Sequence, residues 1–308
     1  MKLSIVATLY RSAPYIVEFH ERATIAAQHV AGGDYEIVLV NDGSPDDSLD
    51  IAVKLAGSDD RVVVVDLSRN FGHHKAMMTG LAHARGEFVF LIDSDLEEEP
   101  EWLSSFHKQM KEDNADVVYG IQERRKGNWF ERWSGQWFYI LLKLLTGFAP
   151  PQNVVTARVM SRRYVDALLQ HQEREVFMAG LWHITGFAQS AHKVKKHSTS
   201  ESTYTLRRKM SILVNSVTSF SNAPLISIFY VGSAISIFSA IYIVYIVLQR
   251  LFWAVPLGGW TSVMASIWLL GGLIIPFIGV VGIYLAKIFS ETKQRPYTIV
   301  RHIYGRNK

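Results

Sequence analysis

The segment Glu87-Phe88-Val89-Phe90-Leu91-Ile92-Asp93-Ser94-Asp95 joins five consecutive apolar residues to two carboxylates separated by one residue. An apolar run without alternation predicts a strand that is covered on both faces, as in a parallel sheet. Similar short apolar runs recur along the first 120 residues. We predict further strands at Leu3–Leu9, Glu36–Val40, Arg61–Asp66 and Asp116–Tyr119.

Segments with helical character separate these predicted strands. They are Pro14–His29, Asp46–Leu55, His73–Ala84 and Pro100–Gln109. Strands that alternate with helices predict an α/β fold with a mostly parallel sheet. Polar residues directly after the strands then predict a ligand site at the carboxyl edge of that sheet.

The C-terminal third has two long uncharged runs, of 24 residues at Leu225–Leu248 and 25 residues at Ser262–Ala286. Each exceeds the roughly 20 residues that a helix needs to cross a bilayer core. Buried core helices are the alternative, but two adjacent uncharged runs of this length favour transmembrane helices. The start, Met1–Thr8, fits a first strand better than a signal peptide, because it has no cleavage site.

Charge and aromatic residues suggest how the chain meets a membrane. Aromatic and basic residues mix near 128–147 and 204–222, which predicts interfacial helices, although a helix covering the soluble core is an equal alternative for the first. The flanks of the two apolar runs are basic, and the link between them has one base, Arg250. The positive-inside rule then predicts a membrane protein whose N-terminal domain and C-terminus are cytoplasmic. We therefore expect a folded cytoplasmic domain at 1–222, two spans within 223–287 and a basic cytoplasmic tail at 288–308.

Composition excludes several kinds of chemistry. The 308 residues include no cysteine, so disulfides, cysteine-ligated zinc and thiol nucleophiles are absent. The net charge of +4 is small, and we expect no nucleic-acid partner.

Carboxylates after two of the strands are candidate ligand groups. Asp42 could accept hydrogen bonds from a nucleoside, or Asp42-Gly43 could be an ordinary turn. Asp93 and Asp95 suit Mg²⁺ or Mn²⁺, which prefer oxygen ligands and keep positions open for phosphate. A helix N-terminus carrying several acids is the alternative; the acids at 97–99 fit it well, whereas Asp93 and Asp95, at the strand end, fit it less well.

Basic residues after two other strands are candidate phosphate ligands. The loop from Asp66 to Lys75 carries arginine, asparagine, glycine and lysine at a strand–helix junction, where it could contact phosphate or be a simple polar loop. Arg124 and Arg125 could clamp phosphates, or they could belong to a solvated charge run.

Together, the motifs Val40-Asn41-Asp42-Gly43-Ser44, Ser68-Arg69-Asn70-Phe71-Gly72 and Asp93-Ser94-Asp95-Leu96 resemble family 2 glycosyltransferases with the GT-A fold. Residues 157–163 and 173–181 are similar to the polyprenyl-phosphate branch, which includes dolichol-phosphate mannose synthases and bacterial bactoprenol glycosyltransferases. The resemblance covers nearly the whole chain and includes the two spans. It is specific for the superfamily but not for the sugar.

This resemblance implies a nucleotide-sugar donor, a polyprenyl-phosphate acceptor at the membrane lipid surface, and Mg²⁺ or Mn²⁺. Relatives can associate through membrane helices, so it is also compatible with a homo-oligomer. It implies site residues of three kinds. The catalytic residues are Asp95, Arg124, Arg125, Arg158 and Arg174, the donor-binding residues are Asp42, Asp66, Lys75, Asp93 and Ser94, and the metal ligands are Asp93, Asp95 and Glu97.

One departure from the family bears on the acceptor. Relatives often carry an Asp-x-Gly-Asp-Phe run before the position of Arg158, whereas this chain has Asn153-Val154-Val155-Thr156-Ala157. A hydroxyl acceptor needs a base, and only Asp166, on a predicted helix, is an acid nearby. A lipid phosphate is already largely anionic at neutral pH and needs none. This favours a lipid phosphate as the acceptor.

Transfer to a hydroxyl of a lipid-linked glycan in cell-surface polysaccharide assembly is the alternative. A non-catalytic nucleotide-sugar-binding or scaffold protein is a third, which the intact Asp93 and Asp95 oppose.

Overall fold

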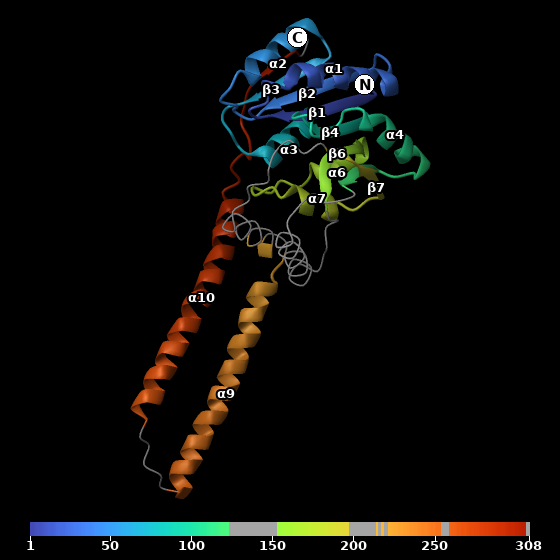
Figure 1. Cartoon of the computed structure of the whole chain (residues 1–308). Helices are drawn as coiled ribbons and strands as arrows, with labels where there is room; N and C mark the ends of the chain where they lie inside the picture. The colour runs from blue at the N-terminus through green and yellow to red at the C-terminus, as the bar shows by residue number, and fades with distance from the viewer. Residues whose placement is uncertain (123–152, 197–213, 215–216, 219–220, 254–258, 306–308) are drawn as a thin grey trace. The chain divides into compact units, whose positions relative to one another are not determined.

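The computed structural model of the chain describes residues 1–122, 153–196, 214, 217–218, 221–253 and 259–305 (Figure 1). It separates into two compact units. The first contains Met1–Phe130, Pro150–Thr203 and Arg295–Lys308, and the second contains Glu131–Ala149 and Tyr204–Gln294.

The first unit is built on an eight-stranded sheet with the order β7-β5-β6-β4-β1-β2-β3-β8. Neighbouring pairs are parallel except those made by β6 and β8, which run against their neighbours. The strands are β1 Leu3–Leu9, β2 Tyr35–Asn41, β3 Val62–Leu67, β4 Phe88–Asp93, β5 Val117–Gln122, β6 Val154–Ser161, β7 Gln189–Val194 and β8 Val300–Tyr304.

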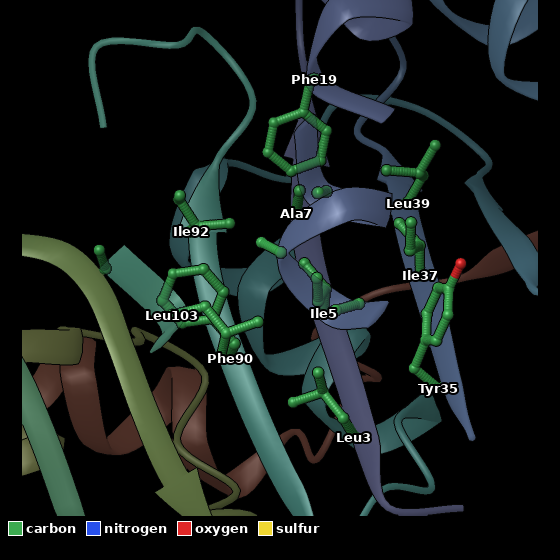
Figure 2. Packing of buried hydrophobic residues seen from close by; sticks show 14 of the residues in the cluster. Leu3, Ile5, Ala7, Phe19, Tyr35, Ile37, Leu39, Phe90, Ile92 and Leu103 are labelled. Atoms are coloured by element: carbon green, nitrogen blue, oxygen red, sulfur yellow. The ribbon is translucent and has the colours of Figure 1, made fainter. Parts of the chain in front are cut away.

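Helices cover both faces of this sheet. They are α1 Ile16–Ala31, α2 Ser48–Ser58, α3 His73–His83, α4 Trp102–Glu112, α6 Arg162–Leu168 and α7 Met178–Ile184. Every residue of β1 and β2 is buried, as the unalternating apolar runs predicted. Figure 2 shows one face, where Ile5 of β1 and Phe90 of β4 pack in the same cluster as Phe19 of α1 and Leu103 of α4. The predicted α/β fold with a mostly parallel sheet is confirmed.

The second unit contains two long apolar helices, α9 Ala223–Trp253 and α10 Trp260–Thr292. Within them, Ala223–Gln249 and Ser266–Thr292 are 27 residues each, with mean hydropathies of 2.2 and 2.3. By length and composition both could cross a membrane, which agrees with the predicted spans near 225–248 and 262–286. The predicted interfacial helix at 128–147 lies outside the described residues, as does most of 204–222.

The chain after α10 contains a strand within the basic tail that we expected at 288–308. Val300–Tyr304 forms β8, which pairs antiparallel with β3 and completes one edge of the sheet. β8 contains both partly buried and exposed residues, and basic residues stand between its apolar ones. Its sequence therefore has neither a continuous apolar run nor a clear alternation that would indicate a strand. Its partner is also more than 200 positions away in the sequence, beyond the reach of local patterns. The catalytic unit therefore includes residues on both sides of the two apolar helices.

Candidate active site at the carboxyl edge of the sheet

The polar residues that follow the strands meet at one edge of the sheet. The parallel register pairs Thr8 of β1 with Asp93 of β4, and Asn41 of β2 with Asp66 of β3. Because β1 to β4 are parallel neighbours, the loops after them leave the same edge. The sequence prediction of a ligand site there therefore has the required geometry.

Asp42 ties two of these loops together. Its carboxylate accepts hydrogen bonds from the backbone N–H groups of Phe71 (2.7 Å) and Gly72 (3.0 Å), and the residue is 2% exposed. Burial raises the pKa of Asp42, although these two hydrogen bonds oppose the shift. Each carboxylate oxygen of Asp42 keeps a second lone pair, which can accept a further hydrogen bond. The contact of Asp42 with a nucleoside stays a prediction.

Gly43 lets the same two loops approach closely. It has a φ of +59°, and a Cβ atom there would lie 2.4 Å from the backbone nitrogen of Asn70. A side chain larger than hydrogen would therefore separate the loops.

Asp66 and Ser94, two of the predicted donor ligands, have internal partners instead. Asp66 is 1% exposed, accepts a hydrogen bond from Asn41 Nδ2 at 2.8 Å, and lies 3.5 Å from Arg301 Nη1 of β8. The Ser94 hydroxyl donates to the carbonyl oxygen of Thr8 at 2.8 Å. These side chains hold the edge together, and their contact with a donor stays a prediction.

Asp93, at the end of β4, is fixed by two neighbours. Its Oδ2 accepts a hydrogen bond from Thr156 Oγ1 at 2.8 Å, and its Oδ1 lies 3.3 Å from His73 Nε2. The other ring nitrogen of His73 is 3.0 Å from Thr8 Oγ1. Burial would raise the pKa of Asp93, but the contacts with His73 and Thr156 and the charge of Lys196 together outweigh it, so the pKa is lowered and the group stays a carboxylate.

The side chains of Asp95 and Glu97 have different partners. Asp95 Oδ1 accepts the backbone N–H of Glu97 at 3.0 Å, around Leu96, which has a φ of +58°. Burial raises the pKa of Asp95; the Glu97 N–H opposes this and the charge of Asp93 adds to it. Glu97 Oε2 instead pairs with Lys196 Nζ at 3.1 Å, so Glu97 turns toward the chain after β7.

Glu98, which no sequence pattern singled out from its acidic neighbours, lies under this site. It is 0% exposed and accepts the backbone N–H groups of Thr156 (3.0 Å) and Ala157 (2.7 Å) at the start of β6. Its Oε1 is also 3.6 Å from Lys196 Nζ. Burial raises the pKa of Glu98 to about 7. Glu98 thus fixes β6, and with it Thr156, beside Asp93.

The predicted acceptor-side arginines lie on β6 and before α7. Arg158 is 1% exposed, donates to the carbonyls of Thr156 (3.1 Å) and Val155 (3.2 Å), and stacks on the Trp182 ring. Burial lowers the pKa of Arg158 to about 9. Arg174 is half-buried in the segment between α6 and α7. That segment is held at the carbonyl of Val176, which lies 3.1 Å from His74 Nδ1 of α3.

Three other predicted residues have less structural support. Arg124 and Arg125 lie outside the described residues. Lys75 is in the first turn of α3, directly after the loop that Asp42 holds, and its phosphate contact stays a prediction.

The carboxylates fit a divalent cation only in part. Within the described ranges, no group of three or more histidine, aspartate or glutamate side chains is arranged to hold a metal ion. Glu97 pairs with Lys196, and its place as a third metal ligand stays a prediction. Asp93 and Asp95 remain suitable, because Asp93 Oδ1 is a buried oxygen without a regular hydrogen bond. Mg²⁺ is commonly held by one or two carboxylates together with substrate phosphates.

Known proteins resemble this chain over most of its length. The model of the family "Glycosyl transferase family 2" matches residues 4–169. A protein of Mycobacterium tuberculosis described as "Putative glycosyltransferases" is 52% identical and covers 99% of this chain and 89% of its own. The "Bactoprenol glucosyl transferase" of Shigella phage SfV is 30% identical and covers 98% of this chain and 99% of its own.

A solved structure shows the same fold. Glucosyl-3-phosphoglycerate synthase from Mycobacterium tuberculosis, solved with phosphoglyceric acid, superposes with a TM-score of 0.51 at 18% identity, over 72% of this chain and 81% of that one. The resemblance to family 2 enzymes of the GT-A fold, and to their bactoprenol branch, is confirmed.

Proposed function

Because the chain belongs to glycosyl transferase family 2, we propose that it transfers a sugar from a nucleotide-sugar donor to a polyprenyl phosphate of the undecaprenyl type. The proposed acceptor is supported by the 30% identity to a bactoprenol glucosyl transferase over 98% of this chain. That alignment includes the region of the two apolar helices. The family makes the chain a glycosyltransferase, so a purely non-catalytic role has no support.

The proposed reaction is displacement at the anomeric carbon of the donor. The acceptor oxygen forms the new bond, and the bond to the nucleoside diphosphate breaks, with inversion at that carbon. Asp42 and its loop would hold the nucleoside, and Asp93 and Asp95 would hold Mg²⁺ or Mn²⁺. The metal, when bound, neutralises charge that develops on the departing diphosphate. Thr156 and His73 keep Asp93 oriented for that role.

The acid–base chemistry of the site supports an anionic acceptor. Glu98 has a pKa suited to a general base, but it is fully buried and both of its oxygens accept backbone N–H groups. Asp166 lies on α6 and pairs with Arg162 at 3.5 Å. Thr156, where relatives often carry an acid, donates its hydroxyl to Asp93. A phosphate acceptor needs no base, since its oxygen is already anionic.

Cationic groups would bind that phosphate. Arg158 is a buried guanidinium whose hydrogen bonds go to neutral carbonyls, so an anion nearby would offset part of its desolvation. We propose that Arg158 and Arg174 approach the acceptor phosphate. Arg124 and Arg125, which lie outside the described residues, stay candidate phosphate ligands from the sequence.

The proposed location is the cytoplasmic face of the inner membrane. The strands before α9 and the strand after α10 belong to one sheet, so both ends of the helix pair lead back to one folded unit. A pair of helices that crosses the membrane twice returns the chain to the side on which it started, as this connection requires. The basic residues that flank the helices favour the cytoplasmic side. Association into a homo-oligomer through these helices is part of the same proposal.

Transfer of radiolabelled sugar tests the proposal directly. The full chain in membranes is incubated with polyprenyl phosphate and a panel of nucleotide sugars, with Mn²⁺ or with EDTA. We expect label in the lipid phosphate that EDTA abolishes and Mn²⁺ or Mg²⁺ restores. Absence of transfer to the lipid phosphate with every donor would refute the acceptor, and transfer that resists EDTA would refute the metal.

A hydroxyl of a lipid-linked glycan is the second candidate acceptor. The observation that favours it is the sequence Asn153–Ala157, which departs from the acidic run of polyprenyl-phosphate enzymes. The same assay with a lipid-linked glycan in place of the lipid phosphate separates the two acceptors.

A further inference from the structure

The strand that returns from the membrane helices has an irregularity beside the candidate donor site. Asp66 of β3 pairs with His302, whereas the next residue, Leu67, pairs with Val300. Arg301 is therefore an extra residue on the β8 side. A bulge of this kind turns the extra side chain away from the regular alternation of the strand.

The Arg301 side chain contacts two groups at the end of β3. Its Nη2 donates a hydrogen bond to the carbonyl of Ser68 at 2.6 Å, and its Nη1 lies 3.5 Å from Asp66 Oδ2. The Asp66 side chain is 1% exposed, whereas that of Arg301 is 59% exposed. A carboxylate buried to this degree needs a compensating charge or hydrogen bonds, and Arg301 supplies the charge beside Asp66 Oδ2, which has no hydrogen-bond partner of its own among the described residues.

The contacts continue from Asp66 into the loop that contains Asp42. Asp66 Oδ1 accepts a hydrogen bond from Asn41 Nδ2 at 2.8 Å, and Asn41 Oδ1 accepts the backbone N–H of Ser44 at 3.2 Å. Arg301 is thus connected through two side chains to the turn at 41–44.

The second donor-side loop is held by the same segment. The N–H of Ser68 donates to the carbonyl of Ile299 at 2.9 Å, next to the hydrogen bond from Arg301 to Ser68. Ser68 begins the loop whose far end, at Phe71 and Gly72, is bound by Asp42. One short segment of the chain, 299–301, therefore contacts the loop that Asp42 binds and is connected through two side chains to the loop that contains Asp42.

We infer that Arg301 is a positioning residue of the donor site, through Asp66 and Ser68, so that nucleotide-sugar binding depends on a residue beyond both apolar helices. Loss of Arg301 leaves Asp66 to find water or another rotamer, which frees Asn41 and loosens the turn at 41–44. The inference rests on the proposed function, because that proposal places the donor at this edge.

The test compares variants of the full chain in detergent. Arg301→Gln removes the charge, Arg301→Lys keeps the charge but not the two-pronged contact, and Asp66→Asn removes the partner. Arg295→Gln is the matched control, because it removes the same charge from an exposed position in the same segment. Each variant is assayed for donor KM, acceptor KM, kcat and melting temperature.

We expect Arg301→Gln to raise the donor KM roughly 5- to 10-fold, as for the loss of one charged hydrogen bond. The kcat and the acceptor KM should stay within about two-fold, Arg301→Lys should be intermediate, and Arg295→Gln should match wild type. Asp66→Asn combined with Arg301→Gln should cost less than the sum of the single changes, since the two residues interact.

A lower melting temperature with an unchanged donor KM would overturn the inference, because it would show a purely structural role. If Arg301→Gln does not fold, an unchanged donor KM in Arg301→Lys is the refuting result. Donor KM values in the Arg301 variants that match wild type refute this inference alone, whereas a wild type that uses no nucleotide sugar refutes the proposed function as well.

Discussion

Replacing Gly43 with alanine should open the donor side of the site. Two costs add at this position. The φ of +59° is unfavourable for alanine by about 1–2 kcal/mol. The new Cβ would also meet backbone atoms of Arg69 and Asn70 at 2.5 and 2.4 Å, an overlap that costs about 1–3 kcal/mol more. The loop cannot move away freely, because Asp42 holds its end at Phe71.

Gly32 provides a control for backbone strain without a close contact. It has a φ of +63°, nothing lies within 4 Å of the place that a Cβ atom would take, and it precedes β2, at the opposite edge of the sheet. Its ψ of −124° lies outside the left-handed α region, so the backbone alone strains an alanine there. Gly32→Ala should therefore lower the melting temperature without moving the loops at the site. At about 2–4 °C per kcal/mol, the summed cost of about 2–5 kcal/mol at Gly43 should lower the melting temperature of Gly43→Ala by roughly 4–20 °C.

The assay combines thermal unfolding of the full chain in detergent with donor kinetics. Gly43→Ala should raise the donor KM, because it separates the loop that contains Asp42 from the loop at 69–72. Gly32→Ala should leave the donor KM unchanged. A donor KM of Gly43→Ala that equals that of Gly32→Ala would refute the reasoning that close approach of the loops is required at Gly43.

Two further predictions concern the carboxylates and the histidine of α3. Asp95→Asn should reduce kcat roughly 100-fold or more without unfolding the protein, because it weakens a proposed metal ligand, whereas Glu97→Gln should have a much smaller effect since Glu97 pairs with Lys196; similar losses in both variants, measured by radiolabel transfer, would contradict the two-carboxylate site. His74→Leu should raise the acceptor KM about 5-fold, because it frees the segment at Val176, and His74→Asn should preserve more function by keeping an N–H donor; an acceptor KM unaffected by His74→Leu would exclude this role.

The central sheet could be predicted from the sequence because its signals are local. Runs such as Phe88–Ile92 carry their own evidence for a strand buried on both faces, and parallel order then places their carboxyl ends together. Asp42 and Asp93 could be located at one edge for this reason. The two apolar helices were equally evident from length and lack of charge.

The contacts that arrange the site come from distant parts of the chain. Thr156 reaches Asp93, Lys196 reaches Glu97, and Arg301 reaches Asp66, and each pair joins residues that have no common local pattern. The sequence therefore assigned Asp66 and Glu97 to ligands without any sign that Arg301 lies beside the first or that Lys196 pairs with the second. Sequence spacing shows which strand end a carboxylate follows but not which way its side chain turns.

The pairing of β8 with β3 also constrains how the protein is made. The ribosome completes β1, β2 and β3 long before it reaches Val300, so β3 remains an unpaired edge until both apolar helices have been synthesised. Such an edge is a template for pairing with other chains. A soluble fragment that stops before α9 would keep that exposed edge permanently, and joining residues 295–305 back to it through a linker should give a better-behaved catalytic domain than simple truncation.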